Sequence, residues 1–229
     1  DMMAKTLALQ GVTLLAASGD DGAAGSMDRS ERFGPCWLTE RFGLQVNWPA
    51  SSPWVTAVGA TMGAASGHRE VVCSVNATGP AAEAAALRPP LITSGGGFSG
   101  EAPRPAWQEG HHGEERRGVP DLSLAGHAYA VVLGGKWLTV DGTSASSPTL
   151  GGMISLINAR RLAEGKERVG FLNPLLYAHP EAFTDVTEGD NRCGSHGTPC
   201  CGGYDAAEGW DPTTGPGTPD FAKLEAALS

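Results

Sequence analysis

Residues 140–148 read Val-Asp-Gly-Thr-Ser-Ala-Ser-Ser-Pro, and they form the boundary between two different sequence patterns. Ahead of them, residues 137–140 have the composition of a strand. Behind them, apolar residues recur at helical spacing: Leu150, Met153, Ile154 and Ile157. Pro148 suits the first turn of such a helix, because a missing N–H costs nothing there. The stretch therefore predicts a strand, a tight glycine turn, a hydroxyl residue and a helix.

This geometry would put Ser144 at the N-terminus of a helix. Free backbone N–H groups and the helix dipole favour negative charge at that position. A serine hydroxyl so placed can attack a carbonyl group, with N–H groups ready for the resulting oxyanion. Serine at a helix start is more commonly an N-cap, so the stretch by itself leaves both interpretations open.

The composition indicates one sizeable folded domain. The chain has 229 residues, of which 41% are hydrophobic, and this content argues against disorder. Its formal net charge of −9 argues against nucleic acid as a partner. No apolar run reaches the roughly 18 residues that a membrane-spanning helix needs, so we expect no membrane span.

The first residues predict an α/β sheet. Residues 1–10 have a helical pattern that Gly11 ends, and residues 12–17 are a continuous apolar run typical of a strand buried on both faces. A helix, a short turn and a buried strand are typical of a doubly wound sheet. Asp20 follows that strand, where such sheets carry their chemistry, although a turn carboxylate is the commoner role. Because Asp1 lies inside a helical pattern, we expect the chain to be the C-terminal part of a longer protein.

Farther along, we expect a second strand at residues 54–58, ended by Gly59, and a hairpin at residues 128–140 around Gly134-Gly135. The glycine-rich stretch 94–99 precedes no clear helix, so we expect it to let the backbone approach a neighbouring segment or a substrate. His111 and His112 are expected to be solvated. From Phe171 the chain has no regular pattern until a short helix at residues 219–228.

Two aspartates on glycine-rich loops, Asp185 and Asp211, could supply oxygen ligands for a hard cation such as Ca²⁺. The five cysteines lack zinc spacing and instead suggest disulfides with one thiol left over. Residues 76–78 form an Asn-Ala-Thr glycosylation sequon, which is usable only in an exported protein.

Six motifs occur in one order: Ala-Ser-Gly-Asp (17–20), Pro-Ala-Ser-Ser-Pro (49–53), Ser-Gly-Gly-Gly-Phe-Ser (94–99), Val-Pro-Asp (119–121), Gly-Thr-Ser-Ala-Ser (142–146) and Gly-Trp-Asp-Pro (209–212). In this combination the chain resembles the sedolisin family of serine-carboxyl peptidases over nearly its whole length. The resemblance implies a subtilisin-like α/β fold, with a doubly wound, mostly parallel sheet and flanking helices. Residues 1–229 would then be the C-terminal part of one catalytic domain, with its upstream part missing.

The resemblance also implies roles for single residues. Ser144 matches the family nucleophile and Asp20 matches its oxyanion-hole aspartate. One structural Ca²⁺ would be bound by two carboxylates and three backbone carbonyls, from Asp185, Val186, Ala207, Gly209 and Asp211. Ala207 stands where the family usually has glycine, a change that a carbonyl ligand tolerates if the backbone keeps its turn.

The chain departs from the family at two points. Asp141 stands where a small residue usually precedes Gly-Thr-Ser, and its carboxylate is expected to raise the local negative field and disfavour an oxyanion. The family activates its serine with a Glu-x-x-x-Asp pair on one helix, and no convincing equivalent occurs between residues 1 and 229. We expect that pair upstream of Asp1, and we expect the present chain to be essentially inactive without it.

The resulting hypothesis is a fragment of an acid serine peptidase that releases tripeptides or cuts within chains. Asp20 can donate to an oxyanion only when it is protonated, which implies an acid optimum. Expected partners are peptide or protein substrates and an N-terminal pro-segment of the same precursor, in a lysosome or vacuole or outside the cell. One alternative is an inactive, calcium-stabilised binding module. Another is a truncated ordinary subtilisin, against which Asp20 argues because asparagine would be expected there.

Overall fold

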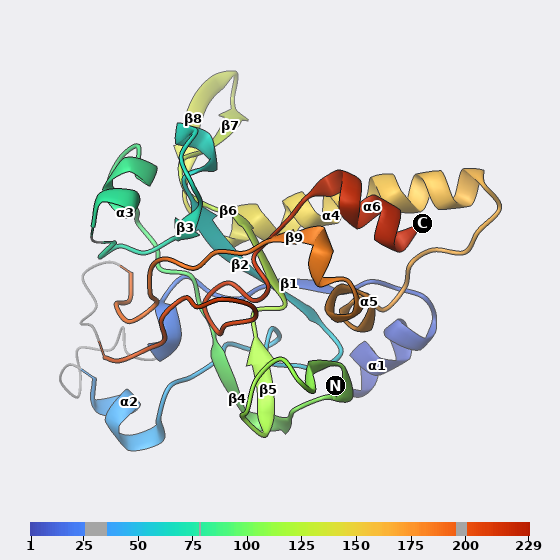
Figure 1. Cartoon of the computed structure of the whole chain (residues 1–229), viewed down its shortest axis with the longest axis horizontal. Coiled ribbons are helices and arrows are strands. Elements are labelled where there is room, and N and C mark those ends of the chain that lie inside the picture. Colours follow the sequence, from blue (N-terminus) through green and yellow to red (C-terminus); the bar gives the residue numbers. More distant parts are fainter. Residues whose placement is uncertain (26–35, 78, 196–200) are drawn as a thin grey trace.

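The computed structural model describes residues 1–25, 36–77, 79–195 and 201–229 (Figure 1). Its central sheet contains β1 (Leu15–Ala17), β2 (Thr56–Met62) and β6 (Leu122–Ala125), which run parallel, with β2 paired to both others. β3 (Val71–Val72) adds an antiparallel pair at the end of β2. The helix α1 (Met2–Leu9) precedes β1. This mostly parallel sheet with helices confirms the expected α/β class.

Strand β2 forms the centre of the sheet, and all seven of its residues are buried. The sequence pattern ended this strand at Gly59, and that prediction was wrong. Gly59 lies in the middle of the strand, where a Cβ would come within 2.4 Å of Ser123 Oγ and 3.0 Å of Pro120 Cγ. The glycine is therefore a point of close approach to the β6 segment and not a strand terminator.

The long helix α4 (Thr143–Ala163) contacts β1, β2 and β6. Its buried Leu150, Ile154 and Ile157 join the main hydrophobic cluster of the chain. Pro148 lies in the second turn and not in the first, which corrects the sequence expectation. Because proline has no N–H, the carbonyl of Ser144 one turn earlier loses its usual helical donor.

Strand β1 is less buried than its apolar sequence predicted, since all three of its residues are only half-buried. Within the described residues it pairs with β2 and with no strand on its other side. The helix α5 (Asn173–Ala178) lies in the segment after Phe171 that we expected to be irregular. Leu176 and Tyr177 of α5 pack in the main cluster, a contact that no local pattern reveals.

The remaining elements surround this core. They are α2 (Trp37–Phe42), α3 (Pro80–Ala85), β4 (Gly97–Pro103), β5 (Arg116–Val119), β7 (Tyr129–Leu133), β8 (Lys136–Val140), α5 (Asn173–Ala178), β9 (Phe183–Thr184), β10 (Thr218–Pro219) and α6 (Phe221–Leu228).

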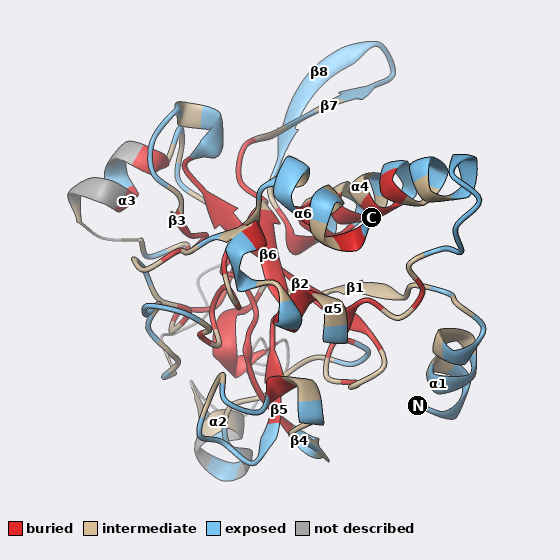
Figure 2. Cartoon of the chain, turned by 45° about the vertical axis from the view of Figure 1, so that its right-hand side comes forward, coloured by how far each residue is buried: buried red, intermediate tan, exposed pale blue. Residues whose placement is uncertain are grey.

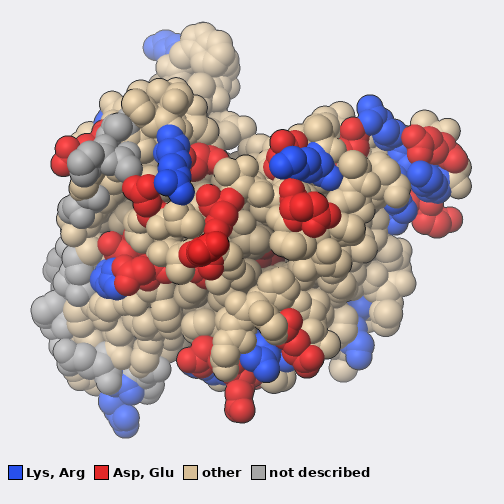
Figure 3. All heavy atoms as spheres, in the orientation of Figure 1, with Lys and Arg blue, Asp and Glu red and all other residues tan. Residues whose placement is uncertain are grey.

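The predicted hairpin is confirmed: β7 and β8 pair antiparallel and turn at Gly134-Gly135. The hairpin projects from the body and is largely exposed (Figure 2). On the face shown in Figure 3, basic side chains are scattered and most lie beside acidic ones. Within the part of the chain that the structure describes, no helix is long and apolar enough to cross a membrane.

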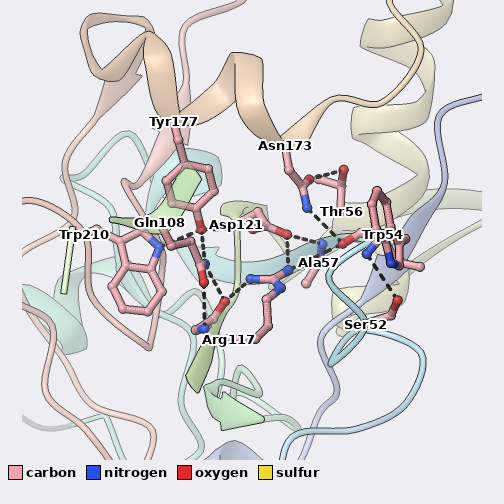
Figure 4. A network of polar contacts seen from close by, with 12 residues as sticks. Ser52, Trp54, Thr56, Ala57, Gln108, Arg117, Asp121, Asn173, Tyr177 and Trp210 are labelled. Atoms are coloured by element: carbon pink, nitrogen blue, oxygen red, sulfur yellow. Dashed lines mark hydrogen bonds and ion pairs between the residues drawn. The ribbon is translucent and has the colours of Figure 1, made fainter. Parts of the chain in front are cut away.

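A buried polar network joins β5 and α5 to the sheet strand β2 (Figure 4). Asp121 Oδ2 accepts hydrogen bonds from Ala57 N (2.8 Å) and Arg117, and Oδ1 accepts one from the Tyr177 hydroxyl (2.9 Å). Gln108 and Trp210 donate to that same hydroxyl. Burial raises the pKa of Asp121, while the Arg117 guanidinium opposes that shift. The Val-Pro-Asp motif is therefore a structural junction of the core.

Candidate active site

Ser144 is the second residue of α4, and its side chain is exposed. Neither its hydroxyl nor its N–H has a hydrogen-bond partner among the described residues. Gly142 occupies the N-cap position, where no side chain caps the helix, so the N-cap interpretation of Ser144 was wrong. Ser146, two residues on, is buried and donates to the Leu124 and Ala125 carbonyls of β6. Of these two hydroxyls, only that of Ser144 is free for chemistry.

Asp20 follows β1, as expected, and its carboxylate reaches the start of α4. Its Oδ1 accepts hydrogen bonds from Thr143 N at 2.8 Å and from Thr143 Oγ1 at 2.7 Å. The Thr143 hydroxyl in turn accepts a bond from Gly19 N at 3.3 Å. The structure thus brings two residues that are far apart in the sequence, Asp20 and Ser144, to the same turn.

The second oxygen of Asp20 has no hydrogen-bond partner in the described parts of the chain. It lies beside Gly142, where a Cβ would be 3.7 Å from Asp20 Oδ2 and 3.5 Å from Ser144 Cβ. The same Cβ would lie 3.4 Å from the free Ser144 N. Glycine at this position leaves open a space that is bordered by the serine, its N–H and a carboxyl oxygen. A developing oxyanion could occupy that space if Asp20 carries a proton.

The carboxylate of Asp141 is held by donors from outside the Ser144 turn. Its buried carboxylate accepts a two-pronged pair of bonds from Arg88, at 2.9 and 2.7 Å. Leu91 N and Ala128 N each donate to it at 2.8 Å. Burial raises the pKa of Asp141, but these hydrogen bonds outweigh burial and leave the pKa below its ordinary value. The charge expected to oppose an oxyanion is therefore neutralised by Arg88.

A cavity of about 420 Å³ opens beside Ser144, between the β7–β8 hairpin and the first turns of α4. Tyr129, Val131 and Val140 line its hairpin side. Asp141 is the single carboxylate among the residues that line the cavity, and it is already paired. None of the residues that line the cavity is therefore a free carboxylate that could act as a general base.

The five residues expected to bind calcium meet in part. Asp185 Oδ2 accepts from Gly209 N at 2.8 Å, and Asp211 Oδ2 accepts from Ala207 N at 3.0 Å, so both carboxylates hold the same loop. Val186 is fully buried next to Asp185. Asp185 Oδ1 is buried without a hydrogen-bond partner. Asp211 Oδ1 accepts from Thr213 N and Thr214 N, and burial raises the pKa of Asp211.

An orphaned, buried carboxylate oxygen suits a cation, so the residues present fit the expected Ca²⁺. Within the described ranges no group of three or more His, Cys, Asp and Glu side chains suits a metal ion. The expected calcium ligands are two carboxylates and three backbone carbonyls, so they do not form a group of three such side chains.

The cysteines divide as the sequence suggested. Cys36 and Cys201 form a disulfide, Cys193 is also disulfide-bonded, and Cys73 is a buried free thiol. Thr78 of the glycosylation sequon lies outside the described residues. Sequence reasoning missed Arg88, which lies 53 positions before its partner Asp141.

Comparisons with known proteins identify relatives of this chain. A scan of protein-family models finds no match. Physarolisin from Physarum polycephalum is 37% identical over 245 residues, which cover 93% of this chain and 41% of that protein. Human tripeptidyl-peptidase 1 is 35% identical over 243 residues, covering 95% of this chain and 37% of the relative.

Among solved structures, Pseudomonas sedolisin, a serine-carboxyl proteinase, superposes with a TM-score of 0.73 at 30% identity. That match covers 98% of this chain and 58% of the sedolisin chain. The present chain thus spans about two fifths of the length of its curated relatives. Over the length that it covers, the chain belongs to the sedolisin family of serine-carboxyl peptidases.

Proposed function

We propose that this chain supplies the nucleophile and the oxyanion site of an acid serine peptidase. One observation carries the proposal: the free Ser144 N–H and the free Asp20 Oδ2 border the same open space beside Gly142. A carbonyl oxygen in that space would leave its carbon within reach of the Ser144 hydroxyl, which has no other partner in the described structure.

In the proposed reaction, Ser144 Oγ attacks the carbonyl carbon of a peptide bond and forms an acyl-enzyme. The N–H of Ser144 and a protonated Asp20 donate to the oxyanion, the amine leaves with a proton, and water then releases the acid. The proton of Ser144 passes to a carboxylate base. We assign that base, a glutamate held by an aspartate, to residues outside this chain. The chain itself would be the C-terminal part of one catalytic domain.

The substrates would be peptides or proteins. The similarity to tripeptidyl-peptidase 1 favours release of tripeptides from free N-termini, with cleavage inside a chain as the alternative. The Cys36–Cys201 disulfide favours an oxidising compartment or the outside of the cell, so we place the enzyme in a lysosome or vacuole or among secreted proteins. An N-terminal pro-segment of the same precursor would be a further partner.

We also propose one structural Ca²⁺, bound by the carboxylates of Asp185 and Asp211 and the carbonyls of Val186, Ala207 and Gly209. The unpartnered Asp185 Oδ1 supports this assignment. The ion would pin the 207–211 loop and would take no part in the chemistry.

The deciding experiment measures cleavage by the full-length protein from pH 3 to pH 8. Paired fluorogenic tripeptides, one with a free and one with an acetylated N-terminus, separate exopeptidase from endopeptidase activity. Ser144→Ala should abolish cleavage, whereas Ser155→Ala, at an exposed position of the same helix, should leave it unchanged. If the wild type cleaves nothing but is stabilised by Ca²⁺, the inactive binding module replaces the peptidase proposal.

A further inference from the structure

The carboxylate of Asp141 joins two other segments of the chain to the residue immediately before the Ser144 turn. Arg88 and Leu91 N reach it from the loop after α3, and Ala128 N and His127 Nδ1 reach it from the start of the hairpin. The Asp141 side chain is fully buried, while that of Arg88 is 30% exposed. A carboxylate with this many charged and N–H donors has little freedom to move.

The turn is held from its other side as well. Gly142 N donates to the Gly126 carbonyl at 2.8 Å, and Thr143 N donates to Asp20 at 2.8 Å. Residues 141 and 142 are thus both tied to the segment 126–128, residue 141 is also tied to the loop after α3, and residue 143 is tied to Asp20. Ser144 is the first residue of the turn whose polar groups are free. Displacement of a catalytic group by about 1 Å can cost about 100-fold in rate, so the tethers before Ser144 matter for chemistry.

We infer that Asp141 and Arg88 form a positioning pair for the Ser144 nucleophile. The pair fixes the strand-to-helix turn, and Arg88 cancels the charge that Asp141 would otherwise place beside the oxyanion. The Asp141–Arg88 pair spans 53 positions, so it closes this turn onto a distant loop. This inference rests on the proposed peptidase function.

The experiment compares Asp141→Asn, Arg88→Gln, Arg88→Lys and the Asp141→Asn/Arg88→Gln double variant in the full-length protein. The kinetic readout separates kcat from KM for the substrate on which the wild type is most active. The second readout is amide hydrogen exchange of residues 142–145, which needs no activity. Arg160→Gln is the matched control, because Arg160 is an exposed arginine at the far end of α4, 59% exposed and paired with Glu225.

Loss of the pair should lower kcat about 10- to 100-fold with KM within about 2-fold, and should speed amide exchange at residues 142–145. Arg88→Lys keeps the charge but not the two-pronged geometry, so it should fall between wild type and Arg88→Gln. The kcat of the double variant should be no lower than that of the less active single variant, because the two single substitutions remove the same contact. Arg160→Gln should change neither readout.

A lower melting temperature with unchanged kcat and unchanged exchange would overturn the inference and leave a purely structural ion pair. If Asp141→Asn fails to fold, the two Arg88 variants decide the outcome. If the wild type shows no cleavage, the proposed function fails separately, and amide exchange alone tests the positioning pair. Unchanged exchange at residues 142–145 in the Arg88 variants would then contradict the inference.

Discussion

Three hydroxyl residues of one helical turn have three different roles, and hydrogen bonding distinguishes them. Thr143 bonds to Asp20, Ser146 bonds to β6, and Ser144 bonds to no described residue. A residue that has no structural role in such a turn is the natural candidate for chemistry. The same comparison applies to Asp20, since one of its oxygens holds the helix and the other is free.

Replacement of Asp20 by asparagine should change the pH profile of cleavage. An amide donates a hydrogen bond at any pH, whereas a carboxyl group donates only when it is protonated. We expect Asp20→Asn to retain a larger fraction of its activity between pH 5 and pH 7 than the wild type. Asp20→Ala should lose about 100- to 1000-fold in kcat throughout. If the Asn variant and the wild type have the same profile, a different group sets the acid optimum.

His112 was expected to be solvated, and the structure corrects this. Its ring packs 5.2 Å from that of Phe98 and 4.7 Å from that of Trp210, and both of its nitrogens are buried without a hydrogen-bond partner. Burial lowers its pKa from 6.5 to about 4, with nearby Arg104 acting in the same direction. The imidazole is therefore kept neutral by aromatic packing.

This depressed pKa predicts a pH-dependent stability. As pH falls from 6.5 to about 4, the unfolded chain takes up the proton before the folded chain does. The contribution of His112 to stability is thus complete above pH 6.5 and is lost progressively through that window. His112→Phe should flatten the fall in urea-unfolding free energy between pH 6.5 and pH 4. His68→Gln, at an exposed position, should reproduce the wild-type slope, and an unchanged slope in His112→Phe would disprove the assignment.

At the scale of single elements, β2 shows why glycine is ambiguous in a sequence. Gly59 reads as a strand terminator, yet it lies inside a fully buried strand. The Ser123 hydroxyl could rotate away from an added methyl group, but Pro120 Cγ at 3.0 Å could not. Glycine is required at position 59 because the neighbouring segment leaves no room for a side chain, and not because of the backbone conformation there.

We expect Gly59→Ala to lower the free energy of unfolding by about 1–3 kcal/mol, because overpacking displaces the β6 segment. Urea denaturation measures the effect. Gly100→Ala is the matched control, since a Cβ at Gly100, also in a strand, meets nothing within 4 Å. Equal losses in the two variants would mean that strand propensity, and not the close approach, determines the cost.

The 207–211 loop is the second element whose stability can be tested separately. Asp211 holds its own loop through Thr213 and Thr214, so Asp211→Ala would destabilise the chain even without metal. Asp185→Asn is the sharper variant, because it can keep an acceptor for Gly209 N while it removes the unpaired charge.

Chelation should lower the melting temperature of the wild type by about 5–10 °C when the Ca²⁺ concentration exceeds Kd about 100-fold. Asp185→Asn should be insensitive to chelator. Glu181→Gln, an exposed neighbour in the sequence, should behave like the wild type. Equal wild-type melting points with and without chelator would remove the calcium proposal.

At the scale of the whole molecule, the Asp121 network connects five distant segments through one carboxylate and one phenol (Figure 4). Arg117 and Asp121 are both fully buried. Removal of one partner of such a pair leaves a buried charge without compensation, which is costly.

Asp121→Ala should therefore lower the free energy of unfolding by about 3–5 kcal/mol, as measured by urea denaturation. Arg116→Ala is the control in the adjacent position, since the Arg116–Glu114 pair is 48% and 49% exposed. We expect that change to cost less than about 1 kcal/mol. A similar loss in both variants would show that the buried network contributes no more than a surface ion pair.

The local patterns predicted the elements that carry strong periodicity. The helix at the start of the chain, the hairpin with its Gly-Gly turn, the helix that contains Ser144 and the last helix all lie where the sequence placed them. The short helix α5 was missed because Leu176 and Tyr177 fold against residues far away in the sequence. Ser144 and Asp20 were predicted as site residues from motifs, and their proximity follows from the parallel sheet that joins their segments.

The sequence by itself determined the strand, turn and helix around Ser144, because glycine, small residues and apolar spacing act within a few residues of one another. It also determined the family, through the order of six motifs. The tertiary structure alone decided what Asp141 does. From the sequence, its negative charge was expected to disfavour an oxyanion. In the fold, Arg88, 53 positions away, pairs with the buried Asp141 carboxylate. Electrostatics depends on distance in space and on exclusion of water, and neither quantity exists until the chain has folded.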